Sequence, residues 1–252
     1  DAKGCFEVRG KTMGIIGYGH IGSQVSVMAE SLGMKVIYYD VEPKLPLGNA
    51  RVVDELDNLL AEADIISLHV PANPQTKNMI GKVEFEKMKT GVVFQNLSRG
   101  SVVDLEALRD AYLSGKVAGA AIDVFPIEPK EKGPGFESSL KGLDNVILTP
   151  HIGGSTLEAQ ENIGVEVSSK LGAYMDNGST VGSQTVPELN LPVQSGTRRI
   201  LHIHHNVPGV LSAINSQLSA YKVNILGQYL KTNESIGYVV LDVDGNTKED
   251  VL

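Results

Sequence analysis

The residues Gly14–Gly22, GIIGYGHIG, contain a G-x-G-x-x-G motif between an apolar strand pattern and a helix pattern. The first glycine of the motif permits a tight turn, the second lets the backbone approach a pyrophosphate, and the third lets helix and strand pack closely. The helix that begins near His20 points its free N–H groups at the phosphates. Asp40 ends the next apolar strand, where a carboxylate accepts hydrogen bonds from a ribose and repels a 2′-phosphate. The combination predicts a dinucleotide site that favours NAD over NADP.

The first two thirds of the chain alternate short apolar runs with amphipathic stretches. This alternation is typical of a doubly wound α/β domain, in which a parallel sheet is covered by helices on both faces. The expected strands are Thr12–Ile16, Lys35–Tyr39, Ile65–Leu68, Val92–Asn96, Ala118–Ile122 and Val146–Leu148. The expected helices lie around Ile21–Leu32, Asp54–Ala61, Lys82–Met88 and Leu105–Ser114, with Asp104 as an N-cap and Gly115 as a stop signal.

The pattern changes after Pro150. One long helix is expected over Thr156–Met175, followed by a linker rich in Ser, Thr, Gly and Pro. A β-α-β-β unit then follows, with a second helix opening over Asn246–Asp250, which is most of a ferredoxin-like unit. Its expected elements are strands at Arg199–His204, Asn224–Leu230 and Gly237–Asp244, a helix at Val210–Tyr221, and a hairpin connection at Asn233–Ser235. We therefore expect domains at 1–175 and 198–252, joined by a linker at 176–197.

Composition restricts the class of protein. With 42% hydrophobic and 21% charged residues, the chain is typical of a globular protein, and its net charge of −8 argues against a nucleic-acid surface. A single cysteine excludes an intrachain disulfide framework. No apolar stretch is long enough to span a bilayer, so no membrane association is expected. These features favour a cytoplasmic protein.

Three polar residues follow predicted strands and are candidates for chemistry: Arg99, Glu128 and His151. Ligands of open α/β sheets bind outside the carboxyl ends of the strands, so these side chains should meet where NAD would lie. A guanidinium can hold a substrate carboxylate through two parallel hydrogen bonds, and an imidazole can exchange the hydroxyl proton. A glutamate on the other ring nitrogen would fix the tautomer. Each residue alone is more often a surface charge or a structural side chain, but the three behind a nucleotide motif favour redox chemistry on an anionic substrate.

The stretches Gly14–Gly22, His69–Pro71, Asn96–Gly100, Ala121–Pro129 and Thr149–Gly154 resemble the D-2-hydroxyacid dehydrogenase family. The resemblance extends over nearly the whole chain and implies a Rossmann-type domain followed by part of a regulatory ACT domain. It assigns the substrate arginine to Arg99, the carboxylate to Glu128 and the acid–base histidine to His151. The cofactor contacts that motif and resemblance together imply are Gly17, Gly19, His20, Ile21, Gly22, Asp40, Val70, Pro71, Leu97, Ser98, Arg99, Asp123, His151, Ile152, Gly153 and Gly154.

The C-terminal unit resembles an amino-acid sensor, and the resemblance places an L-serine site on His204, Asn206 and Asn224. Pro208 and Gly209 precede a helix whose free N–H groups suit a carboxylate. No metal site is expected, because His204 and the adjacent His205 point to opposite faces of a strand. The open edge of the strand Arg199–His204 is expected to pair with the same strand of a second subunit, giving a homo-oligomer.

Among members with a C-terminal ACT domain, the resemblance implies NAD-dependent oxidation of 3-phospho-D-glycerate to 3-phosphohydroxypyruvate. This reaction is the first step of L-serine biosynthesis and is subject to feedback inhibition by L-serine. The family's substrate domain and the end of its ACT domain are not in the chain, so we expect the chain alone to be inactive. Alternatives are another D-2-hydroxyacid dehydrogenase, an inactive NAD-binding and regulatory fragment, or an NAD-sensing partner protein related to this family.

Overall fold

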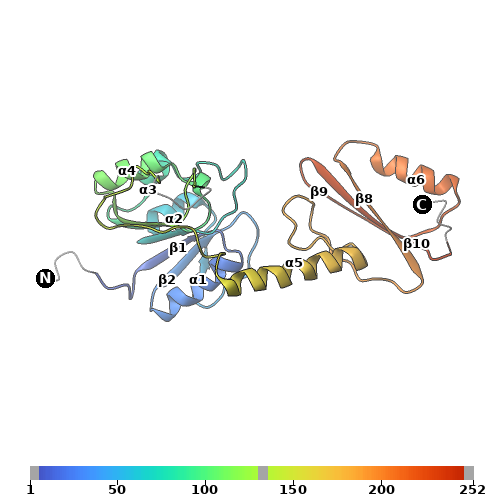
Figure 1. Cartoon of the computed structure of the whole chain (residues 1–252), viewed down its shortest axis with the longest axis horizontal. Coiled ribbons are helices and arrows are strands. Elements are labelled where there is room, and N and C mark those ends of the chain that lie inside the picture. The colour runs from blue at the N-terminus through green and yellow to red at the C-terminus, as the bar shows by residue number, and fades with distance from the viewer. Residues whose placement is uncertain (1–5, 130–135, 247–252) are drawn as a thin grey trace. The chain divides into compact units, whose positions relative to one another are not determined.

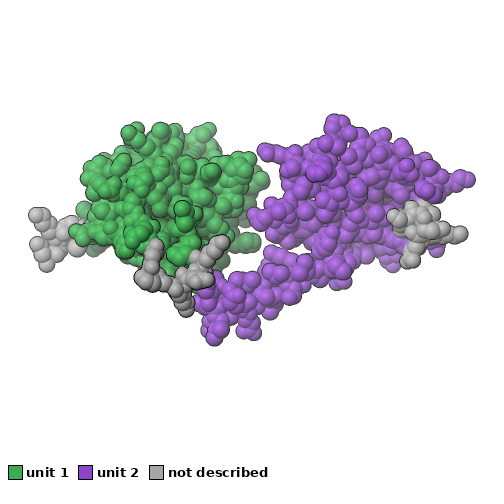
Figure 2. All heavy atoms as spheres, turned by 45° about the horizontal axis from the view of Figure 1, so that its top comes forward, with its two compact units in different colours: residues 1–152 green, residues 153–252 purple. Residues whose placement is uncertain are grey.

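A computed structural model describes residues 6–129 and 136–246. The chain divides into two compact units, residues 1–152 and 153–252 (Figure 2). The helix predicted over Asn246–Asp250 extends beyond the described residues. Within the described part of the chain, no helix is both long and apolar enough to cross a membrane.

The first unit is built on a seven-stranded sheet with the strand order β3-β2-β1-β4-β5-β6-β7. Every pair of neighbouring strands in it is parallel. The order runs outward in both directions from the neighbours β1 and β4, which is the doubly wound arrangement. The strands are β1 (Thr12–Ile16), β2 (Lys35–Tyr39), β3 (Arg51–Val52), β4 (Ile65–Leu68), β5 (Val92–Asn96), β6 (Val117–Ile122) and β7 (Val146–Leu148).

Helices cover both faces of this sheet (Figure 1). Helix α1 (His20–Ser31) packs on the face that carries Met13 and Ile15 of β1. Helices α2 (Leu56–Glu62), α3 (Lys82–Lys87) and α4 (Leu105–Leu113) lie on the other face, over a larger apolar cluster. All five residues of β1 are buried. The central strand is therefore a continuous apolar run because both of its faces meet a helix.

The predicted strands of this unit agree with the structure, with β6 beginning one residue earlier than expected. Asp104 caps α4 through hydrogen bonds from the N–H groups of Glu106 and Ala107, and Gly115 follows the helix with a positive φ of 75°. Two short elements were missed, strand β3 and the 3₁₀ turn η1 (Gly100–Val102).

The second unit contains the long helix α5 (Leu157–Asn177) and a three-stranded antiparallel sheet in the order β8-β10-β9. Its strands are β8 (Thr197–His205), β9 (Ile225–Thr232) and β10 (Ile236–Asp244), and helix α6 (Val210–Ala220) packs on one face of them. Strands β8 and β9 run parallel with β10 between them, as in the split β-α-β arrangement of ferredoxin-like units. Asn233 closes the β9–β10 hairpin by accepting hydrogen bonds from the N–H groups of Ser235 and Ile236.

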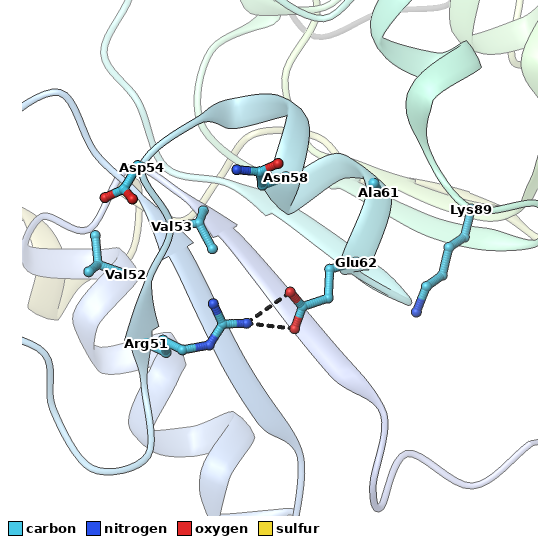
Figure 3. A pocket seen from close by; sticks show the side chains of 8 residues that line it. All are labelled: Arg51, Val52, Val53, Asp54, Asn58, Ala61, Glu62 and Lys89. Carbon is cyan, nitrogen blue, oxygen red and sulfur yellow. Dashed lines mark hydrogen bonds and ion pairs between the residues drawn. The ribbon is translucent and has the colours of Figure 1, made fainter.

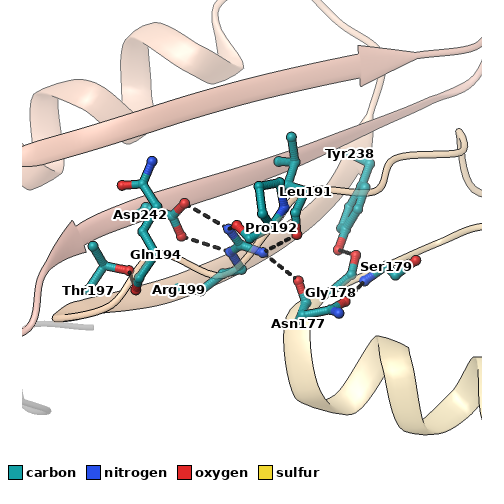
Figure 4. Close-up of polar contacts among 10 residues, drawn as sticks. All are labelled: Asn177, Gly178, Ser179, Leu191, Pro192, Gln194, Thr197, Arg199, Tyr238 and Asp242. Atoms are coloured by element: carbon teal, nitrogen blue, oxygen red, sulfur yellow. Dashed lines mark hydrogen bonds and ion pairs between the residues drawn. The ribbon is translucent and has the colours of Figure 1, made fainter.

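The end of α5 and the segment after it are bound to this sheet through Arg199 of β8 (Figure 4). The Arg199 guanidinium pairs with the buried Asp242 at 2.7 Å and donates to the carbonyls of Asn177, Leu191 and Pro192. The Tyr238 hydroxyl donates to the Gly178 carbonyl at 2.6 Å. These bonds attach residues 177–192 to the three-stranded sheet of the second unit. The predicted domain limits at 175 and 197 remain predictions.

Candidate functional site

The glycine loop after β1 is shaped by what its glycines touch. Gly17 has a φ of 92°, and a Cβ there would collide with the His69 backbone. A Cβ on Gly22 would collide with the Gly17 carbonyl, so the start of α1 lies directly against the loop. A Cβ on Gly19 would meet no described atom within 4 Å. The first and third glycines are therefore required by packing, while the second faces open space where a pyrophosphate can approach.

Helix α1 begins at His20, and no described side chain caps its first turn. The N–H groups of His20, Ile21 and Gly22 therefore remain available to an anion. Asp40, directly after β2, receives a hydrogen bond at 2.7 Å from the Tyr18 N–H within the glycine loop. This bond fixes the Asp40 carboxylate beside the loop, which is the geometry that a ribose contact requires.

The turn after β5 carries Arg99. Its side chain is exposed and donates to the Ser98 carbonyl at 2.7 Å. The following Gly100 lies against the backbone of Phe125 and Pro126, where a Cβ would collide. This close approach brings the turn after β5 to the loop after β6. Gly100 and Phe125 were not among the predicted site residues.

His151 and Glu128 form a hydrogen-bonded pair, although 23 positions separate them in the sequence. The His151 Nδ1 atom lies 2.8 Å from Glu128 Oε2, and Glu128 Oε1 accepts from the Phe125 N–H at 3.0 Å. Burial alone would raise the pKa of Glu128. The hydrogen bonds from His151 and Phe125, together with the nearby charges of His151 and Arg99, outweigh it and lower that pKa. Glu128 therefore stays ionised, and because it binds Nδ1, the Nε2 atom is the ring nitrogen of His151 that can exchange a proton.

Asp123, predicted to contact the nicotinamide carboxamide, has a further role in the structure. Its Oδ1 atom accepts from the Thr149 hydroxyl at 2.5 Å and from the His151 N–H at 3.1 Å. Its own N–H donates to the Asn96 carbonyl at 3.0 Å. Asp123 thus connects the ends of β5, β6 and β7, which carry Arg99, Glu128 and His151. Thr149 was missed by the sequence analysis, although its place two residues before His151 is a usable signal.

The other predicted cofactor residues follow β4, β5 and β7 in the chain. Val70 and Pro71 follow β4, and Val70 lies against the glycine loop, where its side chain approaches Gly17. Leu97 is about half exposed and Ser98 is buried. Ile152 is the last residue of the first unit, whereas Gly153 and Gly154 are the first residues of the second unit.

The predicted effector residues do not meet within one chain. His204 and Asn206 lie at the carboxyl end of β8, whereas Asn224 directly precedes β9. Because β8 and β9 are parallel, these positions are at opposite ends of the sheet. The Nδ1 atom of His204 is buried and has no hydrogen-bond partner among the described residues. Asn206 donates to the Asn233 carbonyl at 2.8 Å.

A separate polar hollow lies between β3, α2 and Lys89 (Figure 3), and none of the predicted site residues lines it. Its cations are already paired, Arg51 with Glu62 at 2.7 Å and Lys89 with Asp64 at 3.0 Å. Among the described residues, no three His, Cys, Asp or Glu side chains are grouped to hold a metal ion.

Residues 1–153 match the family model "D-isomer specific 2-hydroxyacid dehydrogenase, NAD binding domain". The chain belongs to this family. Residues 200–252 match the model "AHAS small subunit-like ACT domain", so the small antiparallel sheet is part of an ACT domain.

Curated relatives in the dehydrogenase family include D-3-phosphoglycerate dehydrogenases of Haemophilus influenzae and Escherichia coli K12. The first is 55% identical over 251 residues, covering 100% of this chain and 61% of that protein. The second is 57% identical over 250 residues, covering 99% of this chain and 60% of that protein. The chain thus spans about 60% of the length of these relatives.

Solved structures of the family also match. The D-lactate dehydrogenase of Aquifex aeolicus, complexed with NAD and lactic acid, aligns with a TM-score of 0.59 and 36% identity over 69% of this chain and 56% of that chain. The NAD-complexed D-isomer specific 2-hydroxyacid dehydrogenase of Lactobacillus delbrueckii aligns with a TM-score of 0.60 and 35% identity. The alignment covers 66% of this chain and 53% of that chain. The cofactor of the dehydrogenase unit is NAD. The open space at Gly19, the uncapped start of α1 and the fixed Asp40 carboxylate fit it.

Proposed function

We propose that this chain supplies the NAD-binding and regulatory parts of an enzyme that oxidises 3-phospho-D-glycerate to 3-phosphohydroxypyruvate, the first step of L-serine biosynthesis. The observation that carries the proposal is the His151–Glu128 hydrogen bond, close enough to Arg99 for its charge to act on Glu128. The names of the relatives support the substrate. Oxidation of a 2-hydroxy acid needs an acid–base group and a cation for the substrate carboxylate, and this chain supplies both in the His151–Glu128 pair and Arg99. We place the activity in the cytoplasm.

The roles follow from the side chains. Arg99 holds the substrate carboxylate through its planar guanidinium, which orients the 2-hydroxyl group. His151 Nε2 accepts the hydroxyl proton, and Glu128 stabilises the imidazolium that forms through its bond to Nδ1. NAD bound at this edge would supply the acceptor for the hydride that leaves the carbon bearing the 2-hydroxyl group. The predicted cofactor residues of the first unit, from Gly17 to Ile152, would hold NAD at the edge where these side chains lie.

The test uses a chain of the relatives' full length. We expect NAD-dependent oxidation of 3-phospho-D-glycerate, and His151→Asn should lower kcat by about 10²–10⁴-fold while NADH binding persists. Arg99→Ala should chiefly raise KM. Undiminished turnover by His151→Asn would refute the acid–base role, and equal kcat/KM for D-glycerate and its 3-phosphate would refute the substrate.

For regulation, the proposed effector is L-serine, bound by His204, Asn206 and Asn224. These residues lie at opposite ends of one sheet, so the site requires two subunits. The split arrangement of β8, α6 and β9, applied again to β10, places the fourth strand of a ferredoxin-like unit beside β8. The β8 edge is then covered within one subunit. The proposed contact between subunits therefore lies at the β9 edge and not, as the sequence suggested, at the β8 edge.

A two-fold axis beside β9 makes the two β9 strands antiparallel. The start of one β9 then lies at the sheet end that carries the partner subunit's His204 and Asn206. This arrangement brings Asn224 to the other two residues, which a single chain does not do. It also covers an edge strand that would otherwise remain open.

Two measurements on the full-length protein test this arrangement. His204→Ala and Asn224→Ala should weaken L-serine binding in calorimetry, whereas the control His205→Ala should not. Leu226→Lys on β9 should weaken self-association in sedimentation experiments. Ile203→Lys on β8, at a similarly exposed apolar residue of the same sheet, should not do so. Unchanged self-association in the Leu226 variant would contradict the β9 contact.

A further inference from the structure

Asn96, the last residue of β5, is fully buried, and its side chain is enclosed by the turn that carries Arg99. Its Nδ2 group donates to the Arg99 carbonyl at 3.0 Å. Its Oδ1 atom accepts from the Ser98 N–H at 3.2 Å and from the Ser98 hydroxyl at 3.0 Å. One amide side chain therefore binds both sides of a turn three residues long.

The Arg99 backbone is held in a single place by these bonds. The Arg99 carbonyl also accepts from the Val102 N–H at 3.2 Å, so two donors fix it. The Asn96 carbonyl accepts from the Asp123 N–H, and Asp123 in turn binds the His151 N–H. Asn96 thus connects the backbone of Arg99 to the loop that carries the imidazole.

The amide is matched to this position by size and by hydrogen-bonding type. A bond to a carbonyl on one side and to an N–H on the other requires one donor and one acceptor on the same short side chain. Aspartate keeps the acceptor but places an oxygen against the Arg99 carbonyl. Serine is too short to reach both sides of the turn.

We infer that Asn96 is a positioning residue that sets the direction of the Arg99 guanidinium and thereby the hold on the substrate carboxylate. The inference rests on the role proposed above for Arg99. A guanidinium forms two parallel bonds to a carboxylate only in one relative orientation. A small misplacement of a group that positions the substrate can lower the reaction rate by about 10²-fold.

The test compares Asn96→Asp with its matched control Gln95→Glu in a chain of the relatives' full length. Gln95 precedes Asn96 on the same strand and points to the opposite face of the sheet, so the control makes the same chemical change outside the turn. We expect Asn96→Asp to raise KM for 3-phospho-D-glycerate and to lower kcat/KM by about 10²-fold. NADH affinity, measured by fluorescence, should change far less than KM in Asn96→Asp, because the Ser98 N–H and hydroxyl keep their acceptor, and should stay at the parent value in Gln95→Glu.

A double-mutant cycle separates this role from a general structural one. If Asn96 acts through Arg99, Asn96→Asp should cause no further loss in an Arg99→Ala background. An equal loss in that background, or a parent-like KM in the single variant, would overturn the inference. Asn96→Ser serves as the second variant if the aspartate protein does not fold. A parent-like KM in Arg99→Ala would instead refute the proposed function.

Discussion

His151 adopts a left-handed backbone conformation, with a φ of 51°, that residues other than glycine rarely take. Such a conformation costs on the order of 1–3 kcal/mol and persists when neighbouring bonds hold it. Here the His151 N–H is bound by Asp123 and its ring by Glu128. The two carboxylates have separate tasks, because Asp123 holds the backbone and Glu128 holds the imidazole.

In a chain of the relatives' full length, Glu128→Gln should lower kcat, because a neutral amide cannot stabilise the imidazolium that forms when His151 takes a proton. The pKa of Glu128 is depressed in the folded protein. Its ionised form therefore stabilises the fold above its ordinary pKa, and this contribution is lost as pH falls through the depressed value. Thermal unfolding of parent and variant should differ at neutral pH and converge in acid. A difference that grows as pH falls would contradict this assignment.

Asp40→Ala should weaken NAD binding and reduce discrimination against NADP, because it removes both a ribose acceptor and a charge that repels a 2′-phosphate. The Tyr18 N–H would also lose its partner. Titration of both cofactors on parent and variant measures the effect. Equal affinity of the parent protein for the two cofactors would count against the role of Asp40.

At the scale of elements, the sheet edge depends on close contact between loops. The turn that begins η1 touches the loop after β6 at Gly100, where backbone meets backbone. The bond from Phe125 to Glu128 starts in that same loop. The spacing between Arg99 and Glu128 is therefore set by a residue that has no side chain.

Gly100→Ala should separate these loops, since the added Cβ collides with the Phe125 backbone. In a chain of the relatives' full length, we expect kcat/KM to fall by about 10²-fold and the unfolding free energy to drop by about 1–3 kcal/mol. Gly81→Ala is the control, because its Cβ would lie 3.6 Å from the nearest described atom and make only an ordinary contact. Kinetics and thermal melts of both variants provide the comparison. Equal effects of the two substitutions would show that the close contact at Gly100 does not set the spacing of the two loops.

Much of the fold is predictable from sequence because buried parallel strands are continuous apolar runs, as in β1. Strand β3 could not be predicted in this way, because it has only two residues and both are exposed. Arg99, Glu128 and His151 were predicted because they follow strands whose carboxyl ends form the ligand site of open α/β sheets, and because the family resemblance assigns them roles. The bond between His151 and Glu128 depends on how two loops fold toward each other, which no local pattern records. Asn96 could have been found, because an asparagine at the end of a strand commonly accepts a hydrogen bond from the N–H two residues on, as in an Asx-turn.

At the scale of the whole molecule, the second unit contains a buried ion pair. The side chains of Arg199 and Asp242 are 11% and 2% exposed. Removing one member of such a pair leaves the other charge buried without compensation. By contrast, the pair formed by Arg51 and Glu62 is about half exposed.

Asp242→Ala should therefore destabilise the second unit by about 3–5 kcal/mol. Glu62→Ala, at the exposed pair, should change stability by about 0–1 kcal/mol. Chemical denaturation followed by circular dichroism compares the two variants. Similar midpoints would show that the Arg199 pair contributes no more than a surface contact does.

The bonds of Arg199 and Tyr238 also determine where a gene fragment that encodes the second unit alone should begin. A polypeptide begun at residue 198 would keep the Arg199–Asp242 pair but lose the carbonyls of Asn177, Leu191 and Pro192. The Tyr238 hydroxyl, which is buried, would lose its acceptor on Gly178. A polypeptide begun at residue 153 keeps all of these acceptors. The best starting point for expressing the second unit on its own is therefore ahead of α5, even though its sheet begins at β8.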